Sequence, residues 1–264
     1  MKSRTKLNLS FALMGLLVSM VLFACSKDDD SDPTPSNPTT SNVNLESGLV
    51  AHYKLNLNYV DASNHFPQMT RTGTLNFSDD RFGNSNLALE FDSLNNNQHA
   101  AIEDSLIEFG KDFTFSYWFS LDTLASTIPQ YTITSRFSSQ GAEQGGLDMA
   151  VNDKLICSLR SNTSAVYARV TSQTLVAKKW YHVLVQQEEA ELSLFLDNQL
   201  VGRDTITNFS NINFPKINYW SLGSGINSGP VILRELDGKL DDIRVYNRVV
   251  NSDERLALNR EENP

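Results

Sequence analysis

Apolar and polar residues alternate along much of the chain with a period of two, which is the spacing of a β-strand. In Phe113–Ser120, large apolar side chains alternate with small polar ones, so the sequence predicts a strand with one buried face. Leu192–Leu196 shows a similar alternation and is followed by Asp197, Asn198 and a second apolar run. An Asp/Asn pair supplies the positive φ angles of a two-residue turn, which predicts a β-hairpin at this point.

Further strands are expected at Tyr181–Val185 and Ile243–Val245, and helix is expected only at the C-terminus. There Asn251 is placed to cap a helical turn, with Glu254 three residues later. Turn-rich clusters separate the apolar runs: Ser93–Gln98, Ser138–Gly146 and Gly223–Gly229. Many short strands with such breaks predict an all-β fold, a two-sheet antiparallel jelly-roll β-sandwich with a short C-terminal helical turn.

The N-terminal segment has the pattern of an export signal. Lys2, Arg4 and Lys6 precede Phe11–Ala24, a 14-residue apolar stretch, and no acid occurs among the first 24 residues. This length is typical of a signal peptide and is short for a membrane span of about 20 residues. The run ending at Cys25 (Leu-Phe-Ala-Cys) resembles the lipobox of bacterial lipoproteins, in which the peptide is cut before the cysteine and that cysteine is acylated. An ordinary secretory signal with an incidental cysteine is the alternative.

We therefore expect a lipoprotein signal peptide over residues 1–24, a lipidated disordered tether over 25–45 and one folded domain over 46–264. The tether is rich in Asp, Pro, Ser and Thr and cannot bury a core. Its run Asp28-Asp29-Asp30 resembles the export signals that bring lipoproteins to the outer face in some Gram-negative bacteria, although solubilising charge is an equal alternative. The expected location is the cell envelope, anchored by the lipid on Cys25 in the outer membrane and exposed at the surface.

The net charge limits the molecules that the protein can bind, and the cysteine content limits the disulfides that it can form. Removing residues 1–24 takes away three basic residues and no acid, so the net charge of −9 becomes −12. Nucleic acid is an unsuitable partner for such a chain, because binding it requires clustered Lys and Arg. An acylated Cys25 leaves Cys157 without a disulfide partner, and we expect Cys157 to be a small buried side chain rather than a reactive thiol.

Several segments, in order, resemble the laminin-G-like, concanavalin A-like jelly-roll domains of bacterial surface proteins. They are Gly48–Leu55, Asp61–Asn64, Asp80–Asp92, Phe113–Phe119, Trp180–Val183, Leu196–Val201 and Leu236–Arg248. The resemblance spans about residues 46–260, and one departure is Asn64, which stands where the family usually has Gly. The resemblance implies a fold more securely than a function, because domains that share one fold carry many unrelated functions.

The β-glucanases, which resemble this architecture, carry Glu-x-Asp-x-x-Glu on one strand, and the chain lacks that pattern. Glu90-Phe91-Asp92 is followed by Asn95 where the acid should be, and Glu235-Leu236-Asp237 is followed by Leu240. No nucleophile elbow, His-Glu-x-x-His motif or phosphate-binding loop occurs either. We expect a domain without catalytic activity.

The resemblance implies a possible Ca²⁺ site, since domains of this family often bind one calcium ion near a sheet edge. Asp61 and Asn64 match the family turn, and Asp241 has the same strand parity as Ile243 and Val245, so regular pairing would point it inward. An inward carboxylate needs a cation or hydrogen-bond donors. The alternative is that Asp241 caps backbone amides and that Asp61 and Asn64 form an ordinary Asx turn.

Aromatic and amide side chains are the candidates for binding a glycan, because sugar rings stack on aromatic faces and their hydroxyls need polar partners. Tyr219 and Trp220 precede a loop rich in Gly, Ser and Asn, and Asn96 lies in a second amide-rich loop. Trp118 lies on the strand face opposite the large aromatic residues that flank it, although core packing is its alternative role.

The combined expectation is a cell-envelope lipoprotein whose laminin-G-like domain binds carbohydrate, for polysaccharide capture or adhesion. A protein-interaction module that holds an envelope protein is the alternative function, and a glycoside hydrolase is the third.

Overall fold

The structure is a computed structural model, and it describes residues 43–92, 98–102, 106, 111–124, 129–136, 144–160, 166–211, 219–226 and 232–260. The expected signal peptide, Cys25 and most of the tether lie outside the described residues, as does Asn96.

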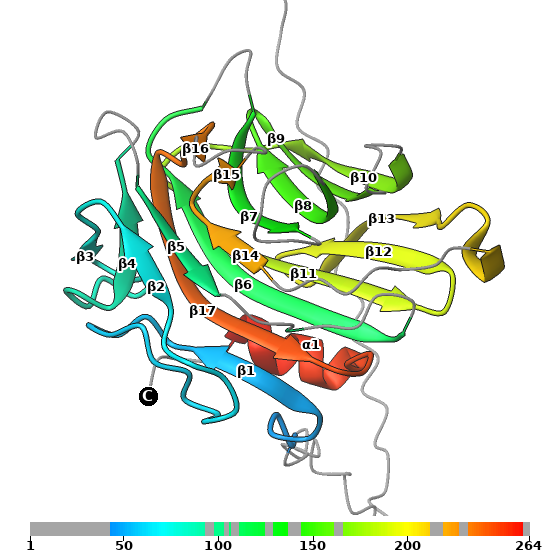
Figure 1. Cartoon of the computed structure of the whole chain (residues 1–264). Coiled ribbons are helices and arrows are strands. Elements are labelled where there is room, and N and C mark those ends of the chain that lie inside the picture. The colour runs from blue at the N-terminus through cyan, green and yellow to red at the C-terminus, as the bar shows by residue number, and fades with distance from the viewer. Residues whose placement is uncertain are drawn as a thin grey trace, which may run out of the picture. The chain divides into compact units, whose positions relative to one another are not determined.

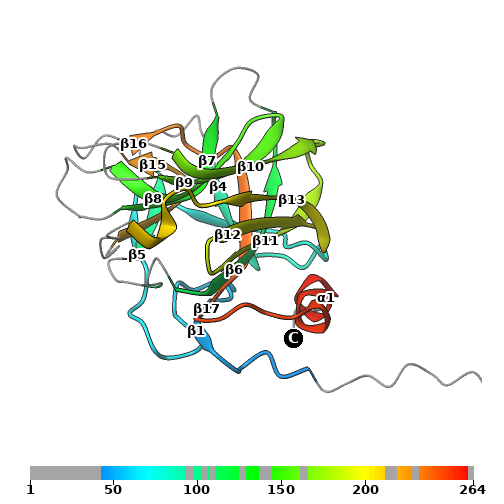
Figure 2. The same cartoon turned by 90° about the vertical axis from the view of Figure 1, so that its right-hand side faces the viewer.

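The described chain forms two antiparallel sheets (Figures 1 and 2). Sheet A has the strand order β13 (Gln199–Thr205), β12 (Glu191–Leu196), β11 (Trp180–Glu188), β6 (Phe113–Leu121), β17 (Gly238–Tyr246), β4 (Ala88–Phe91) and β3 (Asn76–Ser78), with β1 (Leu49–Tyr53) also paired to β17. Sheet B has the order β10 (Val166–Thr174), β9 (Lys154–Arg160), β8 (Gln144–Val151), β7 (Gln130–Arg136), β14 (Tyr219–Leu222), β5 (His99–Ile102) and β2 (Thr70–Thr72). A short hairpin, β15 (Gly225–Ile226) with β16 (Ile232–Leu233), a 3-10 turn (Phe209–Asn211) and helix α1 (Ser252–Arg260) complete the described elements. The predicted all-β, two-sheet antiparallel sandwich is confirmed.

The core lies between the two sheets and is built from the alternating strands that the sequence indicates. Phe113, Phe115, Tyr117 and Phe119 of β6 are all buried against the other sheet's apolar face. Cys157 is also fully buried there, as expected, and burial raises the pKa of its thiol. A thiol held neutral in this way behaves as a small apolar side chain.

The hairpin between β12 and β13 forms where the turn residues predict it. Asp197 and Asn198 adopt φ angles of 50° and 61°, which are the positive values that a two-residue turn between twisted strands requires. This confirms the predicted hairpin, and the three leucines of Leu192–Leu196 are buried in the core.

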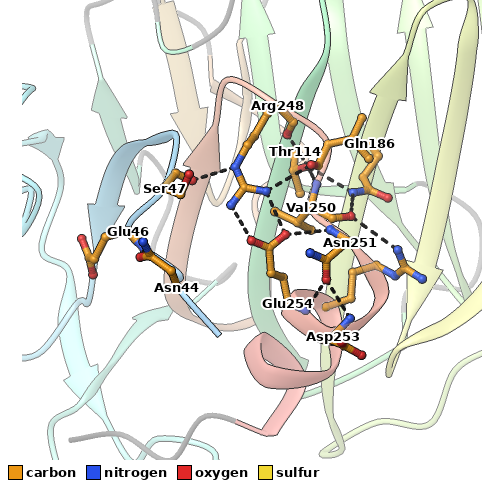
Figure 3. A network of polar contacts seen from close by, with 12 residues as sticks. Asn44, Glu46, Ser47, Thr114, Gln186, Arg248, Val250, Asn251, Asp253 and Glu254 are labelled. Carbon is orange, nitrogen blue, oxygen red and sulfur yellow. Dashed lines mark hydrogen bonds and ion pairs between the residues drawn. The ribbon is translucent and has the colours of Figure 1, made fainter. Parts of the chain in front are cut away.

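Helix α1 begins with the capping box that the sequence predicts (Figure 3). The Asn251 side-chain oxygen accepts hydrogen bonds from the backbone N–H groups of Asp253 and Glu254, and the Glu254 carboxylate accepts one from the backbone N–H of Asn251 at 2.7 Å. Arg248 donates to both carboxylate oxygens of Glu254, at 2.8 and 2.6 Å, and its Nε donates to the carbonyl of Ser47. The helix is thus fixed to the first residues of the described domain.

The same helix covers part of the outer face of sheet A. Leu258 and the preceding Val250 pack against Leu184, Phe195 and Tyr246, which point away from the core. The Gln186 amide donates to the carbonyl of Val250, and the Thr114 hydroxyl accepts from its N–H, as Figure 3 shows. Among the described residues, no helix is long and apolar enough to span a membrane.

Two glycines with left-handed backbone provide a matched test of the packing. An added Cβ at Gly223, φ 76°, would overlap the buried Phe91 ring, whereas one at Gly83, φ 81°, would meet nothing within 4 Å. We expect Gly83→Ala to cost about 1 kcal/mol of unfolding free energy from backbone strain alone. Gly223→Ala should cost at least about 2 kcal/mol more, because it also overpacks the core. Urea unfolding of both variants measures the difference, and equal losses would contradict the packing described for Phe91.

Candidate functional site

Trp118 lies on the outer face of sheet A, as its strand parity predicts, but its ring is partly covered. The Arg81 guanidinium carbon lies 4.9 Å from the centre of the Trp118 ring, and the His182 ring centre lies 5.0 Å away. An arginine over an indole ring is a favourable cation–π contact, and it occupies a ring face that a sugar would need. Trp118 therefore belongs to a packed cluster.

Asp241 lies on this same outer face, which corrects the expectation that it points into the core. The pairing of β17 with β6 is interrupted between Asp241 and Arg244, and Asp242 has a φ angle of 48°. This β-bulge inserts one extra residue, so the parity of Asp241 differs from that of Ile243 and Val245. Asp241 is instead the register partner of Trp118.

The two adjacent carboxylates of β17 are held by a buried ionic network. Arg81 donates to Asp241 at 2.5 Å and lies 3.5 Å from Asp242, and all three side chains are buried. Asp242 also lies 2.7 Å from His52 Nε2 and accepts a hydrogen bond from Arg244 Nε at 3.2 Å. Each carboxylate thus has a positive partner in place of the water it has lost.

Burial and neighbouring charge separate the pKa values of these two carboxyl groups. Burial is the main cause that raises the pKa of Asp241 to about 7, against the opposing charge of Arg81, and the adjacent Asp242 adds to it. Burial acts on Asp242 in the same direction, but the contact with His52 and the charges of Arg244 and Arg81 outweigh it and hold the pKa of Asp242 below its usual range.

Ser116 and His182 form a hydroxyl–imidazole pair on this face. Ser116 Oγ lies 2.8 Å from His182 Nε2, and burial lowers the pKa of His182 to about 3, so its ring stays neutral. A nucleophile and a base at this distance would be a catalytic signature if a substrate could reach them. Their exposed fractions are 2% and 1%, so the pair is part of the packed cluster.

Asp61 organises the loop after β1 through hydrogen-bond donors. Its carboxylate accepts from the backbone N–H groups of His52, Ser63, His65 and Phe66 and from the Ser63 hydroxyl, at 2.7 to 3.0 Å. Burial acts to raise the pKa of Asp61, but these hydrogen bonds outweigh it and lower the pKa. Both oxygens are therefore used as the acceptors of an Asx-type turn.

Asn64 follows in this turn with a φ angle of 62°. Asn tolerates the left-handed region better than most residues other than Gly, which explains how it replaces the glycine usual in the resembling family.

The three residues expected to bind Ca²⁺ do not fit such a site as the structure places them. Both carboxylate oxygens of Asp61 already accept hydrogen bonds, and the Asp241 carboxylate is paired with the Arg81 guanidinium. A Ca²⁺ ion needs several oxygen ligands that converge on it. Among the described residues, no three metal-ligating side chains come together. Calcium binding by the domain stays a prediction, which melting curves with and without EDTA test.

Trp220 is a core residue, which corrects its expected role as an exposed binding aromatic. Its side chain is fully buried, and its ring stacks on Phe115 with ring centres 5.2 Å apart. Tyr219, one position earlier, points to the opposite side and is half-buried on the outer face of sheet B. The Tyr219 hydroxyl lies 3.5 Å from His99 Nε2 of β5.

One row of register partners crosses the outer face of sheet B beside Tyr219. It consists of Thr70, Ala101, Ser221, Thr134, Asp148, Ser158 and Arg169. The small side chains of Ala101, Ser221 and Ser158 in its middle are buried, whereas Arg169 at its end is exposed. Asp148 forms an ion pair with Arg160 at 3.1 Å.

His99 and Arg160 are polar residues that the sequence alone did not single out. Strand alternation would have placed each on an outer face, but only the strand order shows that His99 lies beside Tyr219. The candidate binding surface is therefore the outer face of sheet B, with Tyr219 and His99 on one side and Arg160 and Arg169 on the other.

The chain was compared with models of protein families, with curated proteins and with solved structures. A family model described as the Concanavalin A-like lectin/glucanases superfamily matches residues 94–254, more than half of the chain. A comparison with curated proteins found no match.

Solved structures of similar fold include a domain of an extracellular arabinanase and structures of botulinum neurotoxins. Domain 4 of AbnA, an arabinanase of Geobacillus stearothermophilus solved with arabinotriose, is similar with a TM-score of 0.57 and 17% identity over 80% of this chain and 98% of that chain. The binding domain of botulinum neurotoxin DC, solved with rat synaptotagmin II, gives 0.63 and 13% over 82% of this chain and 52% of that chain. A botulinum neurotoxin type C structure, reported with cell entry dependent on two ganglioside molecules, gives 0.62 and 13% over 81% and 51%. This chain thus spans about half the length of the neurotoxin domains.

The raised pKa of Asp241 makes stability depend on pH in a definite direction. A carboxyl whose pKa is raised on folding, here from 3.8 to about 7, holds its proton more tightly in the folded state. Its stabilising contribution is full below about pH 4 and is lost as the pH rises to about 7. Between about pH 5 and about pH 8 we expect the unfolding free energy of the wild type to fall relative to that of Asp241→Asn, which cannot ionise.

Urea unfolding at the two pH values measures this difference. Asp153→Asn, which removes the same charge from an exposed turn, is the control and should follow the wild type. Parallel pH dependence of the wild type and Asp241→Asn would contradict the shift.

Proposed function

Because the chain belongs to the concanavalin A-like lectin/glucanases superfamily, we propose that it is a non-catalytic carbohydrate-binding module whose ligand lies on the outer face of sheet B. The single observation that supports this most is the placement of Tyr219. It is a half-buried aromatic residue beside His99, on a sheet face whose middle is lined by small side chains. An aromatic ring with polar neighbours is the combination that sugar rings require.

The arabinanase domain supports the same assignment. It was solved with a bound arabinotriose and covers 80% of this chain, so the shared fold is compatible with oligosaccharide binding. At 17% identity it supports the fold and the class of ligand rather than any particular residue.

A binding role is also favoured by where the potential catalytic groups lie. Ser116 and His182, the hydroxyl and the imidazole that lie within hydrogen-bond distance, are 2% and 1% exposed. A hydrolase needs reactive groups that a substrate can reach. The proposal therefore assigns no catalytic residue.

The proposed location is the outer membrane, with the protein anchored by the lipid on Cys25 and the domain exposed at the cell surface. The support is the N-terminal sequence, in which three basic residues, a 14-residue apolar stretch and the Leu-Phe-Ala-Cys run occur in the order of a lipoprotein signal. A glycan captured there would be held at the membrane, which suits polysaccharide uptake or adhesion.

A protein partner is the second candidate function. The neurotoxin DC binding domain, of similar fold, was solved in complex with rat synaptotagmin II. An envelope protein that binds the domain while no glycan does would favour this candidate.

Tyr219→Ala tests the glycan site directly. On a glycan array and then by calorimetry with the best glycan, we expect saturable binding by the wild type and at least about tenfold weaker binding by Tyr219→Ala, because the stacking surface is lost. Phe82→Ala removes an exposed aromatic ring from the loop before β4, away from sheet B, and should bind like the wild type.

Tyr219→Phe retains the aromatic ring, and it is the control that separates a loss of stacking from a loss of affinity caused by misfolding. It should retain most of the affinity, with a melting temperature equal to that of the wild type. Equal affinity of Tyr219→Ala and the wild type would remove Tyr219 from the site, and a blank array would argue against the glycan proposal.

A further inference from the structure

The two sheets carry charge of opposite sign. Counted over the described strands, sheet B has five basic residues (Arg71, Arg136, Lys154, Arg160, Arg169) and one acid (Asp148). The strands of sheet A have three basic residues (Arg203, Lys239, Arg244) and six acids (Glu90, Glu188, Glu191, Asp204, Asp241, Asp242). A surplus of basic residues on sheet B is unexpected in a chain whose net charge is −9.

Most of these basic residues lie on the outer face of sheet B. Arg169 stands between Ala168 and Val170, which are 1% and 6% exposed, so alternation turns Arg169 outward. Lys154 and Arg160 are the first and last residues of β9. Each lies next to a buried leucine, so alternation turns both of them outward as well.

Arg71 is the exception, because it lies at the sheet edge over the Tyr59 ring. Only part of the remaining charge is neutralised within the described residues. Asp148 pairs with Arg160, and the Asp204 carboxylate accepts a hydrogen bond from the Arg169 backbone N–H at 2.7 Å. The side chains of Arg169 and Lys154 have no ion pair among the described residues, and Arg169 is exposed. Several like charges on one face repel one another, and a bound anion relieves that repulsion.

We propose that the outer face of sheet B takes an acidic polysaccharide, one that carries carboxylate or sulfate groups. This deepens the proposed function and rests on it. The basic residues attract the anionic groups, and Tyr219 with His99 supplies the aromatic and polar contact for the sugar ring.

The charge of the remaining surface argues for a polysaccharide rather than a nucleic acid. Duplex DNA carries one negative charge per about 1.7 Å, and binding it requires clustered Lys and Arg along the backbone. The strands of sheet A and the overall charge of −9 repel such a polymer. An acidic glycan also presents sugar rings, for which Tyr219 and His99 supply an aromatic and a polar contact on this face.

The experiment uses the full chain in detergent and four probes: polygalacturonate, dextran sulfate, neutral dextran and duplex DNA. We expect the strongest binding to polygalacturonate or dextran sulfate, and the comparison of these two separates carboxylate from sulfate. Raising the salt from about 50 to about 300 mM should weaken binding to the acidic glycan by about tenfold, because exposed charges are screened.

Arg169→Gln is the decisive variant, since Arg169 is exposed and forms no ion pair among the described residues. It should weaken binding to the acidic glycan severalfold. Arg203→Gln is the matched control, because it removes the same charge from an exposed arginine on β13 of sheet A and should leave binding unchanged.

The outcomes separate this inference from the proposed function. Binding of neutral glycans that is insensitive to salt and to Arg169→Gln would overturn the acidic class and leave glycan binding intact. No binding of any glycan would overturn both. Binding of DNA as tightly as the acidic glycans, with equal sensitivity to Arg169→Gln, would overturn the choice of a polysaccharide.

Discussion

The adjacent carboxylates Asp241 and Asp242 on the last strand of sheet A require compensation, because a carboxylate removed from water is stable only beside positive charge and hydrogen-bond donors. The partners come from distant parts of the sequence. Arg81 arrives from the loop before β4, His52 from the first strand and Arg244 from two positions further along β17. The β-bulge at Asp242 allows both acids to reach these partners. The network therefore fixes the first strand, the loop before β4 and the last strand in one arrangement.

This network and helix α1 cover part of the outer face of sheet A. Trp118 lies under Arg81, His182 is buried, and Leu184 and Phe195 are covered by the helix. Sheet B has a different outer face, with half-buried Tyr219 and exposed Arg169. Sheet A thus carries the buried ionic network, and the ligand site proposed above lies on the outer face of sheet B.

Much of the fold could be predicted from the sequence, because strand alternation and turn chemistry are local. Phe113–Phe119, the Asp197-Asn198 turn and the capping box at Asn251 all occur as expected. The errors have a common cause. The inward direction expected for Asp241 assumed regular pairing, and a bulge leaves no mark in a single sequence.

Adjacent residues of a strand point to opposite faces, so an error in the predicted face changes which of the two is exposed. Trp220 and Tyr219 were both candidates for an exposed pair, yet adjacent strand positions must point to opposite sides, so only Tyr219 reaches the outer face. The proximity of His99 to Tyr219 depends on the pairing of β5 with β14, which joins segments 120 residues apart. Such pairings are set by the whole fold and not by local pattern.

The contact between Arg248 and Ser47 has a mechanical consequence. The described domain begins just before Ser47, and any pull on the chain from that side reaches the sandwich there. The Arg248 guanidinium holds the Ser47 carbonyl and Glu254 at once, and β1 then pairs directly with the last strand (Figure 3). Tension that enters at one end is passed directly to the helix and strand at the other, so the two ends of the domain resist force together.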